Sequence, residues 1–187
     1  IDVETVMTGN WDLTTGDGSI TLTLPPAFNA DLDAETSDGA VRSSVAGGAP
    51  TTLAIETNPA GVFVGGGYVY WTGGAAPGSS LLDGALRRQP VGGGPTENMA
   101  TDLDQPGALI LANGLVYLAT EDEVSVVDPA APGVVSAFAT NIGDPGRFAV
   151  DGTYLYWTEP GGRVLRKAFA GGPVATLAEG IAQPYGI

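Results

Sequence analysis

The sequence contains no cysteine and no histidine among its 187 residues. The lack of cysteine excludes a disulfide framework and a thiolate metal site. The lack of histidine removes the commonest general base and the commonest metal ligand, together with every Ser-His-Asp arrangement. The glycines at 92–94 do not form a phosphate loop, because no Lys-Ser or Lys-Thr pair follows them. We therefore expect no catalytic residue, no metal ion and no cofactor.

Basic side chains are scarce: 7 Lys and Arg stand against 21 Asp and Glu, which gives a net charge of −14. A surface this acidic repels phosphate groups and anionic lipids, so we expect no nucleic-acid partner. Long apolar runs are missing too. The longest, residues 108–119, is interrupted by Asn113-Gly114 and is too short to cross a bilayer. We therefore expect no membrane insertion.

Glycine and proline are abundant, with 29 and 14 residues, which is typical of short strands joined by tight turns. One aromatic stretch, residues 67–72 (GYVYWT), returns at 153–158 (TYLYWT) and more weakly at 114–119 (GLVYLA). A proline lies eleven residues before the tyrosine at the fourth position of each stretch, which is Tyr70, Tyr117 or Tyr156. A period near 40 residues with one such strand per unit is typical of a β-propeller array.

The units from residue 46 onward predict four strands each. A short strand centred on Leu53, Met99, Phe138 or Leu177 opens the unit, and a polar residue before proline, an apolar strand, a tight turn, the aromatic strand and a third strand follow. The sequence therefore predicts an all-β fold with β-propeller-type blades, about three complete and a fourth partial, over residues 46–187. The paired basic residues Arg87-Arg88 and Arg166-Lys167 are expected to be exposed charges on edge strands.

Residues 1–45 predict a different β segment. Ile20, Leu22 and Leu24 alternate with threonines, as in a half-buried strand. Two similar units, residues 15–20 (TGDGSI) and 36–41 (TSDGAV), lie 21 residues apart, a plausible length for one coil of a β-solenoid. The alternative is a degenerate blade, because residues 38–42 (DGAVR) match 83–87 (DGALR). The lack of an aromatic strand there favours a separate solenoid-like segment.

Two resemblances follow from these motifs. Residues 46–187 resemble the YWTD-type propeller and the related bacterial repeat arrays that contain the sequence PYGI, as residues 184–187 do. The fourth motif position departs from that family, which has Asp where this chain has Gly73, Thr120 and Glu159. Residues 14–41 resemble the bacterial putative adhesin domain, which folds as a β-solenoid. Together these resemblances imply an exported bacterial protein that is secreted, periplasmic or on the cell surface. The first residues, from Ile1, show no signal-peptide pattern, as in a processed protein or a fragment.

The aromatic pairs have two interpretations: a stacking platform for a sugar or peptide, or packing between blades. We favour packing, because residues that recur in each repeat usually pack the repeat. The expected structural core is Tyr70, Trp71, Tyr117, Leu118, Tyr156 and Trp157.

The residues before the repeated prolines are the best candidate ligand-binding residues. In a propeller the apolar strand lies innermost, so the loops that lead into it surround the central channel. The alternative is that these residues only shape a turn. The candidates are Asn58, Gln105, Asp144 and Gln183.

We expect a non-enzymatic binding or scaffold module whose partner is a protein, peptide or glycan. The first alternative is a propeller enzyme resembling streptogramin lyase or a lactonase, which the absence of histidine disfavours. The second is an architectural segment of a surface fibre. A stack of about three blades also leaves an apolar flank uncovered, so we expect self-association or further blades of a parent chain.

Overall fold

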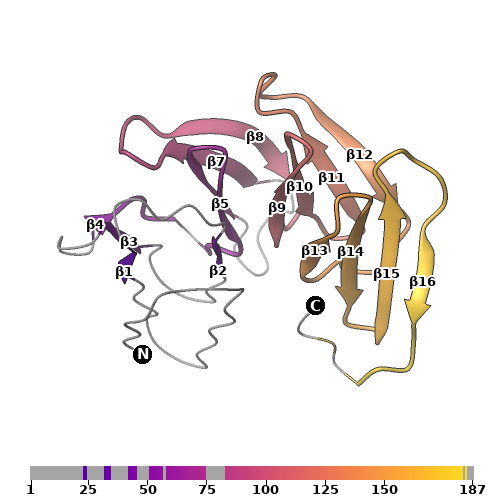
Figure 1. The fold of residues 1–187 in the computed structure, drawn as a ribbon. Helices are drawn as coiled ribbons and strands as arrows, with labels where there is room; N and C mark the ends of the chain where they lie inside the picture. The colour runs from indigo at the N-terminus through magenta and orange to yellow at the C-terminus, as the bar shows by residue number, and fades with distance from the viewer. Residues whose placement is uncertain are drawn as a thin grey trace.

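The computed structural model describes residues 23–24, 32–34, 42–45, 51–56, 58–74, 83–182 and 184. This part of the chain consists of strands and connecting turns, without a helix. It accordingly has no helix long and apolar enough to cross a membrane. Three similar antiparallel sheets, which we call blades 1, 2 and 3, make up most of it (Figure 1). The prediction of an all-β fold built from blades is confirmed.

Each blade contains four strands that are neighbours both in the chain and in the sheet. In each blade the register shifts between the third and fourth strands, as at a β-bulge, which increases the twist of the sheet. Blade 1 comprises β5 (Val62–Gly65), β6 (Tyr68–Gly73), β7 (Gly84–Pro90) and β8 (Glu97–Leu103). Blade 2 comprises β9 (Leu109–Ala112), β10 (Leu115–Ala119), β11 (Glu123–Val127) and β12 (Val135–Thr140). Blade 3 comprises β13 (Phe148–Val150), β14 (Tyr154–Glu159), β15 (Arg163–Ala168) and β16 (Ala175–Ala178).

The phase of the repeat differs from the sequence prediction. The strands that contain Met99, Phe138 and Leu177 were expected to open a unit, whereas β8, β12 and β16 close the preceding sheet as its fourth strand. The sequence does not show whether such a short strand joins the sheet before it or the sheet after it. Only the hydrogen bonds between strands decide this. The Leu177 segment therefore completes blade 3.

The tight turns between the first two strands of each blade use different chemistry. Asn113 and Gly114 both have positive φ, 51° and 79°, as the predicted Asn-Gly hairpin requires. Gly66 and Gly67 do the same in blade 1, with φ of 58° and 83°. In blade 3 the Asp151 carboxylate instead accepts the backbone N–H groups of residues 153 and 154 at 2.9 and 2.8 Å. All three turns place the aromatic strand against the inner strand.

The N-terminal strands connect to the blades across the predicted boundary at residues 45 and 46. β1 (Thr23–Leu24) pairs in parallel with β3 (Arg42–Val45), and their partners are 21 residues apart, as stacked coils of that length require. β3 also pairs with β4 (Thr51–Thr52), and β2 (Leu32–Ala34) adds to the free edge of β5. The division into a solenoid-like segment and blades stays a prediction, and most of residues 1–45 lie outside the described part.

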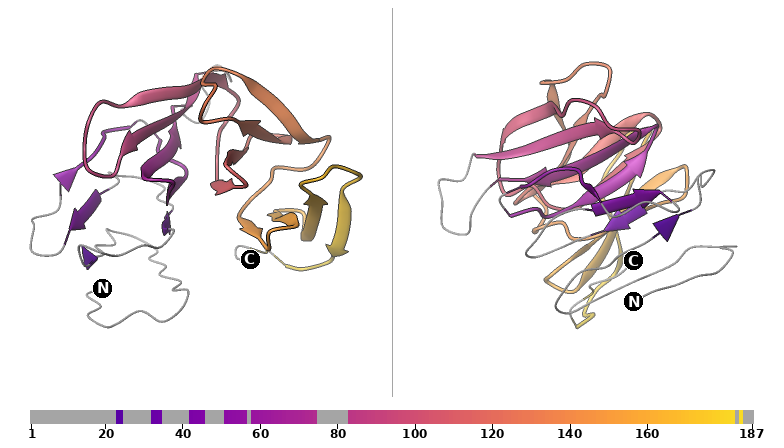
Figure 2. Two further views of the ribbon diagram at one scale, coloured as in Figure 1. Left: turned by 45° about the horizontal axis from the view of Figure 1, so that its top comes forward. Right: turned by 90° about the vertical axis from the view of Figure 1, so that its left-hand side faces the viewer.

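The three blades follow one another along an arc (Figure 2). Blade 2 lies between the other two, and its inner strand β9 contacts both β5 and β13. Gly61 allows the close approach of blades 1 and 2, since a Cβ atom there would lie 2.6 Å from the Gly107 carbonyl oxygen. The innermost strands of the three blades therefore lie side by side, on the concave side of the arc.

The aromatic pairs pack between these blades. Side chains alternate along a strand, so the two members of a pair face opposite sides of their sheet. In β6, Tyr70 faces blade 2 and Trp71 faces the N-terminal side of blade 1. In β10, Tyr117 faces blade 3 and Leu118 faces blade 1, and Trp157 of β14 faces blade 2. All five side chains are buried, whereas Tyr156, the sixth residue of the predicted core, is only half-buried.

The paired basic residues do not lie on edge strands, so that expectation was wrong. β7 lies between β6 and β8, and β15 lies between β14 and β16. Arg88 stacks over the ring of Tyr68, 4.5 Å from its centroid, and its Nη1 donates to the Pro129 carbonyl oxygen of blade 2 at 3.1 Å. A positive charge at this position therefore joins two blades.

Candidate functional site

The repeated prolines fix the start of the inner strand in each blade. Pro59, Pro106 and Pro145 are buried. The backbone N–H of the residue after each proline donates to a carbonyl oxygen at the end of the aromatic strand, at 3.2 Å in blade 1, 2.9 Å in blade 2 and 2.7 Å in blade 3. These three bonds place the segments after the prolines at the same end of the three blades. The bonds run from Ala60 to Thr72, from Gly107 to Ala119 and from Gly146 to Thr158.

A side-chain hydrogen bond joins blades 1 and 2 at this end. The Thr72 hydroxyl donates to the Gly107 carbonyl oxygen at 2.7 Å and accepts the Gly61 N–H at 3.0 Å. Thr72 is the threonine of the aromatic motif, and it is fully buried. Ala119 takes its place in blade 2 and cannot form this bond. The motif threonine is therefore a structural joint between two blades.

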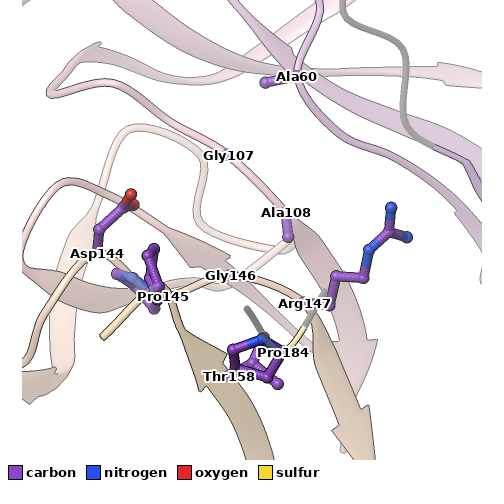
Figure 3. A pocket seen from close by; sticks show the side chains of 10 residues that line it. Ala60, Gly107, Ala108, Asp144, Pro145, Gly146, Arg147, Thr158 and Pro184 are labelled. Atoms are coloured by element: carbon purple, nitrogen blue, oxygen red, sulfur yellow. The ribbon is translucent and has the colours of Figure 1, made fainter. Parts of the chain in front are cut away.

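These segments enclose a cleft of about 390 Å³. It draws residues from all three blades, with small side chains and backbone on the side of blades 1 and 2 and the charged groups on blade 3 (Figure 3). Its size is that of a small-molecule or short-peptide site. The lining residues are Ala60, Gly107, Ala108, Asp144, Pro145, Gly146, Arg147, Thr158, Pro160 and Pro184.

Asp144 and Arg147 supply the charges of the cleft. Asp144 lies in the middle of the loop between β12 and β13, and Arg147 is the last residue of that loop. Both side chains extend toward the side on which Ala60 lies (Figure 3). Asp144 is exposed and Arg147 is half-buried. A carboxylate offers acceptors and a guanidinium offers a fork of donors, so the pair can orient a polar ligand from two ends.

Further acidic side chains lie next to Asp144. The pKa of Glu121 is raised, most strongly by the negative charge of Asp104 and next by a hydrogen bond to Asp104. The charges of Asp122 and Asp144 raise it further. Glu121 and Asp122 are exposed. Within the described ranges, no group of three or more acidic side chains has a geometry that could hold a metal ion. The cluster makes this rim of the cleft strongly negative.

The four residues predicted from the sequence are placed differently from one another. Asp144 lines the cleft. Asn58 and Gln105 have positive φ, 47° and 42°, so both shape the turn into the inner strand, and neither lines the cleft. The cleft is lined instead by Ala60 and Gly107, two residues further along the chain. Gln183 lies outside the described residues.

Sequence reasoning missed Arg147 and Thr158. Both occupy fixed positions of the repeat: Arg147 stands two residues after its proline, and Thr158 is the motif threonine. At the position of Arg147, blade 1 has Gly61 and blade 2 has Ala108, so the arginine departs from its small counterparts. That departure within a repeat was the signal that could have identified it.

No protein-family model matches this chain, and no curated protein matches it. The chemistry of the cleft is therefore the basis for a functional assignment.

Proposed function

We propose that this chain is a non-enzymatic binding module of an exported bacterial protein, secreted, periplasmic or on the cell surface. Its ligand is a peptide, a loop of a partner protein or a glycan, held in the cleft at the start of the inner strands. The observation that carries the proposal is the convergence of three blades on one cleft with Asp144 and Arg147 at its blade 3 side.

The composition of the cleft supports binding rather than turnover. Two of its lining side chains are charged, and the remaining ones are small, proline or threonine. Asp144 is exposed, and no second carboxylate among the described residues lines the cleft to form an acid–base pair with it. A rigid wall of prolines and backbone groups suits an extended polar ligand, because little ordering accompanies binding.

The resemblance to YWTD-type propellers is part of the same proposal. Recurrent aromatic strands, the buried prolines and the four-stranded blades support it. At the fourth motif position, blade 3 has Glu159 and not Asp. The Glu159 carboxylate accepts the Gly143 N–H at 3.0 Å and pairs with Arg163. A longer acidic side chain therefore serves in blade 3 at the position where the family has Asp.

The experiment is a binding screen with peptide and glycan arrays, followed by calorimetry on the strongest probe. Asp144→Ala and Arg147→Ala are expected to weaken binding at least about tenfold each, because a charge-assisted hydrogen bond contributes about 1.5–3 kcal/mol. The melting temperature of Asp144→Ala is expected to stay unchanged, since that side chain is exposed.

Asp128→Ala is the matched control. Asp128 is an exposed carboxylate at the end of β11, at the opposite end of blade 2 from the cleft. It is expected to leave affinity unchanged. Equal affinity of the wild type and Asp144→Ala would remove the cleft as the binding site. Turnover of a lactone or cyclic depsipeptide that Asp144→Ala abolishes would replace the proposal with an enzyme.

A further inference from the structure

Blade 1 and blade 3 differ in what covers one equivalent face of each, the face that in blade 1 packs against blade 2. On the side of blade 1 that faces blade 2, Met99 is 0% exposed and Leu103 is 5% exposed. They lie seven and three residues before Pro106. The residues seven and three before Pro184 are Leu177 and Ile181, which are 46% and 40% exposed. Equivalent apolar positions are therefore buried by a neighbouring blade in one case and open to solvent in the other.

The tyrosines on the same faces repeat this difference. Tyr70 is buried against blade 2, whereas its counterpart Tyr156 is half-buried and donates its hydroxyl to Asp151 at 2.6 Å. Both tyrosines have a tilted tyrosine neighbour at about the same distance, 6.0 Å for Tyr68 and 6.1 Å for Tyr154. The face of blade 3 therefore has the aromatic surface that blade 1 presents to blade 2, without the partner.

Arg88 and Arg166 are the equivalent arginines of these two faces. Arg88 Nε donates to Glu97 at 2.8 Å, and its Nη1 donates to the Pro129 carbonyl oxygen of the next blade at 3.1 Å. Arg166 lies over Tyr154 at 4.4 Å, as Arg88 lies over Tyr68 at 4.5 Å. Its Nε atom is buried without a hydrogen-bond partner within the described part of the chain, because Ala175 stands opposite Arg166 in the ladder where Glu97 stands opposite Arg88. The bond that depends on a neighbouring blade is the one from Arg88 Nη1 to Pro129, and in the described part of the chain no blade lies on this face to accept such a bond from Arg166.

We propose that the face of blade 3 formed by Tyr154, Tyr156, Arg166, Leu177 and Ile181 is a docking surface for another blade of the same repeat. The incoming blade presents the aliphatic side that blade 2 presents to blade 1, where Leu109, Val116 and Leu118 are buried. A backbone carbonyl of its third-to-fourth-strand loop accepts a hydrogen bond from an Nη atom of Arg166, as that of Pro129 does from Arg88 Nη1.

The source to which we assign this blade is the polypeptide that continues from Pro184. Pro184 lines the cleft together with Thr158. In the joint between blades 1 and 2, the motif threonine likewise meets the start of the next inner strand, through its bond to Gly107. Pro184 therefore occupies the place at which an inner strand of a fourth blade begins. A second copy is a poorer occupant, because Leu53 and Ala54 already pack on the opposite flank around Trp71.

The test extends the full chain by one repeat. Residues 110–143 are copied after Ile187, so that Pro184–Ile187 and the copy together reproduce blade 2 and its Asp128-Pro129 loop. The matched control carries the same extension with the residue copied from Leu118 changed to Asp, which removes the aliphatic contact. Thermal unfolding is measured for both, and for each with Arg166→Ala.

The extended chain is expected to melt higher than the original, and the control is not. Arg166→Ala is expected to lower the melting temperature by about 2–4 °C in the extended chain. This is the shift expected when a chain of this size loses one hydrogen bond between blades. The same change is expected to have less effect in the original chain, where Arg88→Ala is the reference for a docked arginine.

Three results would overturn the proposal. One is an unchanged melting temperature on extension, and another is an equal effect of Arg166→Ala in both chains. The third comes from light scattering on the original chain: a dimer that Ile181→Asp converts to monomer would assign the surface to a second copy. If the original chain and its Ile181→Asp variant are both monomers, the result supports the assignment to a fourth blade.

Discussion

Trp71 in blade 1 and Trp157 in blade 3 occupy the same position of the repeat, but they are held differently. Trp71 Nε1 donates to the Glu56 carboxylate at 3.0 Å, and the same carboxylate pairs with Arg87. Trp157 is completely buried among apolar side chains, and its Nε1 has no acceptor in the described part of the chain. The same indole therefore joins a polar network in one blade and apolar packing in the other.

The cause lies in residues that do not repeat. Glu56 stands three residues before Pro59, and Ile142 takes that position before Pro145. Opposite the tryptophan in the β ladder, blade 1 has Arg87 and blade 3 has Leu165. The repeat thus fixes the ring and its burial, while the neighbours decide whether its N–H is satisfied. Four predictions test this comparison.

The largest effect is expected for Trp157→Ala. Removing a completely buried ring leaves a cavity between blades 2 and 3, which costs about 3–5 kcal/mol of unfolding free energy. Urea denaturation followed by circular dichroism measures it. A loss below about 1 kcal/mol is typical of a surface position, and would return Trp157 to the stacking-platform interpretation.

The fourth motif position sharpens the same comparison, because Gly73 stands in blade 1 where Glu159 stands in blade 3. Glu159 is 2% exposed, accepts the Gly143 N–H and pairs with Arg163. Glu159→Ala is expected to cost about 2–3 kcal/mol, since bonds to a buried charge are lost. The exposed Glu179 is the control, and Glu179→Ala is expected to change little. Equal losses for the two variants would mean that the buried pair does not stabilise blade 3.

A smaller effect separates the two indoles directly. Trp71→Phe and Trp157→Phe remove similar volume, but only the first breaks a hydrogen bond. Trp71→Phe is expected to cost about 1 kcal/mol more than Trp157→Phe, the net contribution of one hydrogen bond. The two denaturation midpoints give the difference directly. A larger loss for Trp157→Phe would reverse the assignment of polar and apolar support.

The smallest effect concerns the tyrosines at alkaline pH. Burial raises the pKa of Tyr70 above its usual value of 10.0, with a smaller opposing effect of Arg88. The folded state then retains a proton that the unfolded state releases, so stability is full below pH 10 and falls as pH rises above it. Tyr70→Phe is expected to flatten this fall of stability in denaturation measured from pH 9 to 11.

The pKa of Tyr156 is raised mainly by its hydrogen bond to Asp151, so Asp151→Asn is expected to lower that pKa in a spectrophotometric titration. An unchanged pH profile in Tyr70→Phe would contradict the first assignment, and an unchanged Tyr156 titration the second.

The candidate site was only partly predictable. The pre-proline rule led to Asp144, because a loop before an inner strand has a defined place in a blade. It also led to Asn58 and Gln105, which have positive φ in the turn before the inner strand and do not line the cleft. Arg147 reaches the cleft from a position that holds Gly61 and Ala108 in the other blades, and a comparison of the repeats at this position was needed to single it out.

The sequence by itself determined the strands, their hairpin turns and the alternation that sends Tyr70 and Trp71 to opposite faces. These features depend on neighbours within a few residues, through the two-residue period of a strand and the positive φ of glycine and asparagine. Only the tertiary structure decided that the Leu177 strand closes blade 3, that Arg88 joins two blades and that the indole N–H of Trp157 has no partner in the described part of the chain. Those outcomes depend on contacts between segments far apart in the chain, and the pattern within one repeat does not contain them.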